Sequence, residues 1–133
     1  MTESRPLVYA CSGCSNVAQL ANRVAVAMDR DGRAEMSCIA GVGGGVRSLV
    51  RRARSGRPVI AIDGCPLACV RHCLEGVGVT ADYHTTLTDH DLRKRYREDY
   101  GEETVAEVRQ RVEAEATGAG LFAPATDASA VRG

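Results

Sequence analysis

The stretch VIAIDGCPLACVRHC, residues Val59–Cys73, decides the fold. Its first four residues are apolar, which is typical of a short buried strand. Asp63 and Gly64 then give a turn signal. Pro66 is well placed for the first turn of a following helix, because proline has no N–H to leave unsatisfied there. A strand, a turn and a helix in this order are the repeating unit of an α/β domain.

Two further strand–turn–helix units precede this one, and a weaker strand and a last helix follow it. Successive units of this kind predict right-handed crossovers and a parallel sheet. The expected strands lie within residues 6–10, 34–40, 59–62 and 79–89, and the expected helices within residues 17–28, 46–56, 66–78 and 103–115, with a glycine turn at 41–45.

We therefore expect an α/β fold, a small three-layer domain with helices on both faces of a mainly parallel sheet. The sheet should have about four strands with Rossmann-like or flavodoxin-like winding. A length of 133 residues suits one domain, which we place at residues 5–116. Residues 117–133 are rich in glycine and alanine and show no sustained period. They are predicted to form a loosely ordered tail.

The charges argue against two classes of partner. Seventeen basic and seventeen acidic side chains cancel, so no net field attracts nucleic acid or an anionic membrane. We expect neither partner, and we interpret the five arginines of residues 46–57 as a solvated helix face. The N-terminus has no apolar secretory segment. The chain is therefore predicted to be cytoplasmic, where thiols stay reduced and serve metal binding or redox chemistry.

Five of the six cysteines lie at or just beyond the ends of the first three expected strands. Because the carboxyl ends of parallel strands share one edge of the sheet, we expect these thiols to lie together there. They are Cys11, Cys14, Cys38, Cys65 and Cys69. Zn²⁺ prefers thiolate sulfur and takes four ligands in a tetrahedron, so these five residues are our candidate metal ligands. An iron–sulfur cluster also takes four thiolates and is the alternative cofactor.

Other residues near these thiols are assigned weaker roles. Asp63 is a candidate to orient a metal ligand or to accept hydrogen bonds from the glycine turn. Gly43 and Gly44 are candidates to bring the backbone close to the thiols or to bind a small anion. His72 and Cys73 are weak candidates, a solvent-facing histidine and a packed thiol being the plainer interpretations.

A second function fits the same thiols. Cys14 and Cys65 are expected at helix N-termini, where the helix dipole lowers a thiol pKa. The chain could then be a thiol-based redox or sulfur-transfer enzyme or carrier, with one of these residues as nucleophile and a second thiol nearby as its partner. Whether the chain is an enzyme stays open at this point.

Three segments resemble the DGC-domain proteins, a group of small bacterial and archaeal proteins. They are CSGCSNVAQLAN (11–22), MSCIAGVGGGV (36–46) and IDGCPLAC (62–69), and the resemblance covers residues 7–95. Asp63, Gly64 and Cys65 match the motif that names the family. The resemblance implies zinc binding, with cysteines of the family pattern at Cys11, Cys38, Cys65 and Cys69. At the position of Cys14 the pattern also accepts a small residue. It implies no particular reaction or substrate.

Overall fold

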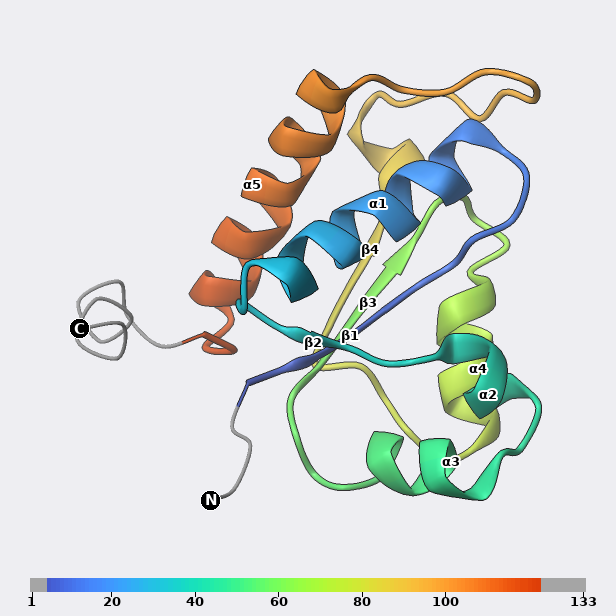
Figure 1. Ribbon diagram of the computed structural model, residues 1–133, viewed down its shortest axis with the longest axis vertical. Helices are drawn as coiled ribbons and strands as arrows, with labels where there is room; N and C mark the ends of the chain where they lie inside the picture. The colour runs from blue at the N-terminus through green and yellow to red at the C-terminus, as the bar shows by residue number, and fades with distance from the viewer. Residues whose placement is uncertain (1–4, 123–133) are drawn as a thin grey trace.

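Four parallel strands form one sheet in the order β2–β1–β3–β4 (Figure 1). The computed structural model describes residues 5–122 of the chain. Every residue of the two central strands is buried. The expected parallel sheet is confirmed, and β1 lies between the strands that follow it in sequence. The strands are β1 (Leu7–Ala10), β2 (Glu35–Met36), β3 (Val59–Asp63) and β4 (Tyr83–Thr86).

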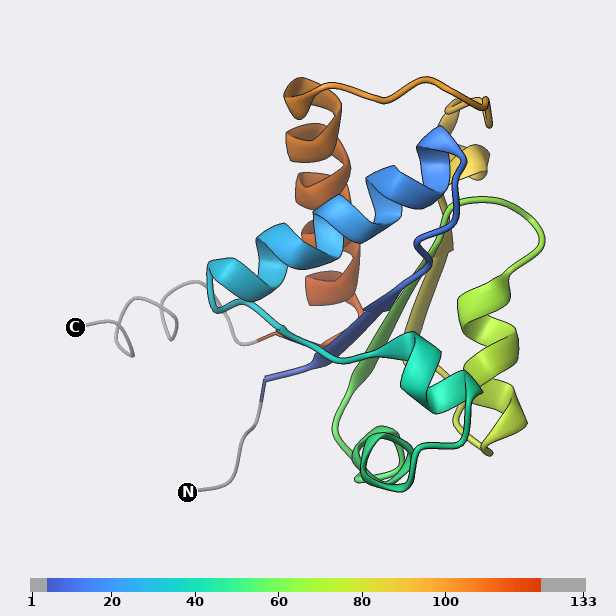
Figure 2. The same cartoon turned by 45° about the vertical axis from the view of Figure 1, so that its right-hand side comes forward.

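Helices cover both faces of the sheet, as expected for a doubly wound α/β domain. One face is covered by α1 and α5, and the other by α2, α3 and α4 (Figures 1 and 2). None of the helices described in residues 5–122 is long and apolar enough to cross a membrane. The helices are α1 (Asn16–Arg30), α2 (Ile39–Gly43), α3 (Arg47–Ala53), α4 (Cys69–Gly76), the 3₁₀ helix η1 (Leu87–His90) and α5 (Glu102–Gly118).

The alternation of side chains along β3 positions the functional edge. Ile60 and Ile62 pack in the core beneath α1 and α5, whereas Val59 and Ala61 pack with α4 on the other face. Successive residues of a strand point to opposite faces. At the end of the strand this alternation directs Asp63 to α4, and one residue further it directs Gly64 to α1; the contacts of both residues agree with it.

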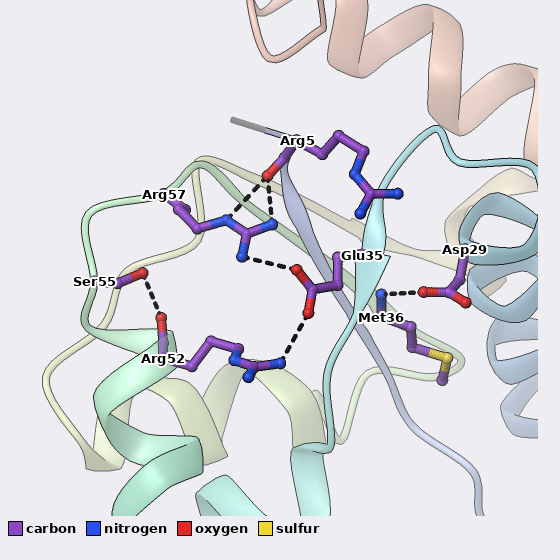
Figure 3. A network of polar contacts seen from close by, with 7 residues as sticks. All are labelled: Arg5, Asp29, Glu35, Met36, Arg52, Ser55 and Arg57. Carbon is purple, nitrogen blue, oxygen red and sulfur yellow. Dashed lines mark hydrogen bonds and ion pairs between the residues drawn. The ribbon is translucent and has the colours of Figure 1, made fainter. Parts of the chain in front are cut away.

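The edge strand β2 is short and is held by charged side chains (Figure 3). The Glu35 carboxylate receives Arg52 through one oxygen and Arg57 through the other, each at 2.8 Å. Arg57 also donates two hydrogen bonds to the Arg5 carbonyl, and the Met36 N–H donates to Asp29. A short edge strand with charged neighbours resists pairing with the edge of another sheet.

Three local predictions were wrong. The expected strand at 34–40 has only two residues in the sheet. The helix α2, Ile39–Gly43, includes the end of that expected strand and the first half of the expected glycine turn at 41–45. The expected helix at 66–78 begins only at Cys69, because Ala68 adopts a left-handed conformation with φ 53°. The β3–α4 turn is therefore longer than the Asp-Gly turn that the sequence indicates.

The C-terminal helix extends past the expected domain end. It continues to Gly118, and Phe122 beyond it is buried. The Arg33 guanidinium lies 4.4 Å from the centre of the Phe122 ring. This cation–π contact holds the segment after α5 against the turn that follows α1. Most of the predicted tail, from residue 123 on, lies outside the described residues.

Candidate functional site

The carboxyl ends of β1 and β3 are joined through a thiol. The Gly64 N–H donates a hydrogen bond to Cys11 Sγ at 3.2 Å, which links the residue after β1 to the residue after β3. Cys65 and Cys69 are close enough to Cys11 for their charges to act on it. The segment after β1 and the segment after β3 thus meet at one edge of the sheet, although 53 positions separate Cys11 from Gly64.

Burial dominates the chemistry of Cys11. It raises the pKa of this thiol to about 11, and the negative charges of Asp63, Cys65 and Cys69 add to the rise. The hydrogen bond from the Gly64 N–H acts in the opposite direction. Without a bound cation, Cys11 is a protonated thiol at neutral pH and a poor nucleophile.

This predicts unequal labelling of the two cysteines in the β1–α1 turn. At pH 8 about one Cys11 thiol in a thousand is ionised, three units below its pKa of about 11. Cys14 is exposed. Iodoacetamide should label Cys11 at least about tenfold more slowly than Cys14 in the folded, chelator-treated protein, as measured by peptide mass spectrometry. In urea the two rates should converge. Equal rates in the folded protein would contradict this description of Cys11.

Asp63 fixes the start of α4. Its carboxylate is only 1% exposed and accepts hydrogen bonds from the N–H groups of Val70 at 2.8 Å and Arg71 at 3.2 Å. The formal cap residue, Ala68, contributes no side-chain hydrogen bond. His84 Nε2 on β4 lies 2.9 Å from the second Asp63 oxygen. Asp63 thus takes the place of an N-cap from the neighbouring strand, and the negative carboxylate also suits the helix dipole.

The glycine segment packs against Cys73, and its hydrogen bonding does not favour the predicted anion site. A Cβ at Gly43 would lie 2.9 Å from Cys73 Sγ, so glycine allows α2 to pack closely against α4. The Gly44 N–H donates to the Ala40 carbonyl at 2.9 Å, which leaves it no hydrogen for an anion. Cys73 is half-buried, and burial raises its pKa.

Cys38 and Cys14 are exposed at the starts of other helices. Cys38 caps α2, its Sγ accepting the Gly41 N–H at 3.4 Å. Cys14 precedes Ser15, the residue that caps α1. Within residues 5–122, no hydrogen bond joins either thiol to Cys11, Cys65 or Cys69. The expectation that Cys65 begins a helix was wrong, since it lies four residues before α4.

His72 is exposed on the outer side of α4. Within residues 5–122 its side chain makes no hydrogen bond or ion pair, so its exposure suits the plainer interpretation of a solvent-facing histidine.

A basic loop that the sequence did not assign to the site passes beside these thiols. The segment between η1 and α5 runs along the start of α1 in both views (Figures 1 and 2). Asn16 fastens it, donating to the Arg93 carbonyl at 3.0 Å and accepting the Arg95 N–H at 2.6 Å. Between these two anchors, Lys94 places its ammonium 3.5 Å from Cys65 Sγ. Both Lys94 and His84 were missed, since neither belongs to a motif.

The thiols offer the donors that zinc prefers, but they do not form a ready-made set. Across residues 5–122, no three His, Cys, Asp or Glu side chains converge in an arrangement that could hold a metal ion. The six cysteines are all free thiols. A shared ion would require the exposed side chains of the edge to turn toward Cys11. The donor chemistry therefore fits a thiophilic metal, while the side-chain arrangement as it stands does not.

Comparisons with known proteins agree with the thiol pattern. The family model of the DGC domain matches residues 7–112. The chain is 67% identical over 94 residues to a protein of Pseudomonas aeruginosa strain PAO1 described as "Anaerobic and virulence modulator AnvM". That alignment covers 71% of this chain and 72% of the relative. No solved structure matches the chain. The family match spans most of the sequence and includes every strand of the sheet, so the chain belongs to the DGC-domain family.

Proposed function

We propose that this DGC-domain chain is a cytoplasmic zinc-binding protein whose metal is held at the carboxyl edge of the sheet. Cys11, Cys65 and Cys69 would supply three thiolates, and Cys38 or Cys14 the fourth. The observation that carries the proposal is the hydrogen bond from the Gly64 N–H to Cys11 Sγ, which joins the ends of β1 and β3 next to Cys65. Four thiolates in a tetrahedron are a common zinc site.

The electrostatics of the edge support a cation there. Burial raises the pKa of Cys11 to about 11, and the negative charges of Asp63, Cys65 and Cys69 add to the rise when no cation is bound. A bound divalent ion would reverse the effect, because a metal-bound thiol loses its proton. Binding would then release protons, so affinity for zinc should rise with pH. The Lys94 ammonium beside Cys65 would balance part of the negative charge of the thiolates.

A regulatory role is consistent with the name of the relative. The P. aeruginosa protein is described as a modulator of anaerobic and virulence behaviour. We infer that the present chain also acts by modulation, with a thiol site whose metal occupancy or redox state changes under different conditions. Exposed thiols at the rim of the edge, Cys14, Cys38 and Cys69, are the groups that such conditions would reach first.

Zinc content tests this proposal. We expect one zinc ion per chain by native mass spectrometry, removable by a chelator. Cys65→Ser should reduce the zinc content at least about tenfold under competition with a chelator, because the affinity for zinc depends on every thiolate that binds it. Cys73→Ser is the matched control, since it removes a thiol of the neighbouring helix turn and should keep the metal. Equal zinc content in the wild type and in Cys65→Ser would overturn the assignment.

Thiol chemistry is the second candidate, and the contact between Lys94 and Cys65 favours it. The Lys94 ammonium lies 3.5 Å from Cys65 Sγ, so a positive charge stands directly beside this sulfur. A metal-free wild-type protein with one fast-reacting thiol at Cys65 would support a redox or sulfur-transfer role. Anaerobic purification separates the third possibility, since an iron–sulfur cluster would give a coloured protein with stoichiometric iron and sulfide.

A further inference from the structure

Five arginines lie on α3 and the turn after it, and they divide into two groups. Arg52 and Arg57 are both neutralised by Glu35, as Figure 3 shows. Their charge is used within the fold, to hold α3 against the edge strand β2. The other three are Arg47, Arg51 and Arg54. No acidic residue occurs between positions 36 and 62 to neutralise them locally.

The second group forms one unpaired basic stripe. Arg47, Arg51 and Arg54 are spaced i, i+4 and i+7, so they share one side of the helix and its end over about 10 Å. All three are exposed, and among residues 5–122 none of them makes an ion pair or a side-chain hydrogen bond. Three like charges on one helix side repel one another, which costs stability unless an anionic partner covers them.

The stripe borders a groove with an apolar floor. The groove has a volume of about 630 Å³ and lies between α3 and the end of α4. Val50 and Val77 form its apolar part, and Ser55 and the three arginines of the stripe line the rest. Both valines are half-buried. The groove therefore offers an apolar strip flanked by positive charge.

We propose that this groove between α3 and α4 binds an acidic segment of another protein, one that inserts an apolar side chain between Val50 and Val77. The charge of the stripe is complementary to aspartate and glutamate, and arginine is enriched in protein interfaces. The apolar floor provides the desolvated contact that charge pairs alone lack.

Other occupants fit the groove less well. A nucleic acid is disfavoured because the chain carries no net positive charge and the groove has no aromatic side chain for base stacking. A small anion is disfavoured because the arginines are exposed and the groove is open, whereas small-ligand sites enclose most of the ligand. A second copy docking through its acidic α5 would make a heterologous, head-to-tail contact rather than the self-complementary contact of a two-fold dimer, the commonest oligomer.

The groove is distinct from the thiol edge. Cys69 is the first residue of α4, whereas Val77 directly follows its last residue, so the two surfaces lie at opposite ends of this helix. The proposed partner is thus independent of the proposed metal. Binding to the groove should persist in Cys65→Ser, provided that this variant folds.

Peptide binding tests the proposal. The probe is a fluorescein-labelled 14-residue peptide of glutamate and leucine with helical spacing, and its counterpart carries glutamine in place of glutamate. Fluorescence anisotropy should show binding of the acidic peptide only, weakening as salt is added. The triple variant Arg47→Glu, Arg51→Glu, Arg54→Glu should lower the affinity at least about tenfold, as expected for three lost charge pairs. Because all three positions are exposed, it should keep the wild-type melting temperature.

The matched control is Arg97→Glu. This arginine is exposed in the loop before α5, which Figures 1 and 2 place at the far end of the molecule from α3. The Arg97→Glu variant should bind the acidic peptide with an affinity close to that of the wild type. Equal loss in both variants would show a non-specific charge effect and overturn the proposal.

Three further outcomes would also overturn it. They are stronger binding of a duplex DNA oligonucleotide than of the peptide, displacement of the peptide by millimolar inorganic phosphate at constant ionic strength, and concentration-dependent self-association in sedimentation that the triple variant abolishes. These results would assign the groove to nucleic acid, to a small anion and to a second copy respectively.

Discussion

Replacing Gly64 with alanine should destabilise the fold by about 3 kcal/mol, the upper range for adding an atom to a packed interior. A Cβ at this position would lie 2.7 Å from the Val17 carbonyl carbon and 2.8 Å from the Ala18 nitrogen. These are backbone atoms in the first turn of α1, so no side chain can rotate away to make room. Relief of the clash requires α1 to shift from the sheet, and α1 contributes much of the core.

Gly13→Ala is the control for this prediction. Gly13 belongs to a loop at the same edge, but a Cβ there would find only the Ala18 side chain, at an ordinary 3.8 Å. Urea unfolding followed by circular dichroism should show a lower midpoint for Gly64→Ala and a nearly unchanged midpoint for Gly13→Ala. Coincident midpoints for the two variants would mean that α1 yields without cost.

The same substitution should disturb the thiols. The Gly64 N–H is the donor to Cys11 Sγ, and the Gly64 carbonyl accepts the Thr88 N–H of η1 at 3.2 Å. Gly64 therefore joins α1, Cys11 and η1 at a single residue, through its two adjoining peptide groups. The middle residue of the Asp-Gly-Cys motif is explained by this close approach of two backbones rather than by a special turn conformation.

Sequence reasoning predicted the sheet well because its signals are local. Four apolar residues before an Asp-Gly turn indicate a buried strand, and α1 repeats apolar residues such as Leu20, Val24 and Met28 on one side. The parallel arrangement then follows from the order of the elements. By contrast, the segment from Cys65 to Ala68 depends on a left-handed residue and on a cap supplied from β3, neither of which leaves a periodic pattern.

The thiol edge was predicted only in part for the same reason. Cys11 meets the segment that begins with Gly64 and Cys65 because the ends of β1 and β3 share an edge, which topology alone can foresee. His84 reaches the edge through β4 and Lys94 through an irregular loop fastened by Asn16. These positions depend on tertiary hydrogen bonds, over 21 positions for His84 with Asp63 and over nearly 80 positions for the Asn16 anchors of the loop, so no local spacing indicates them.

Replacing Asp63 with alanine should have the other large effect, a loss of about 4 kcal/mol, because hydrogen bonds to a buried charged group contribute about 1.5–3 kcal/mol each. The change removes the acceptor for the Val70 and Arg71 N–H groups and the partner of His84. Asp63→Asn should cost less, since the amide oxygen can still accept one N–H group. Both stability losses can be measured from the urea unfolding midpoints of the two chelator-treated variants.

His84→Gln separates helix capping from a role at the metal. It leaves both backbone hydrogen bonds of Asp63 in place, so it should cost the metal-free protein far less stability than Asp63→Ala. If Asp63 served mainly to orient a metal ligand, Asp63→Ala would lower zinc affinity and leave the metal-free unfolding midpoint unchanged. The geometry predicts instead that Asp63→Ala lowers the unfolding midpoint of the metal-free protein. The carboxylate first secures the start of α4, and only through that helix does it act on the position of Cys69, the first residue of α4.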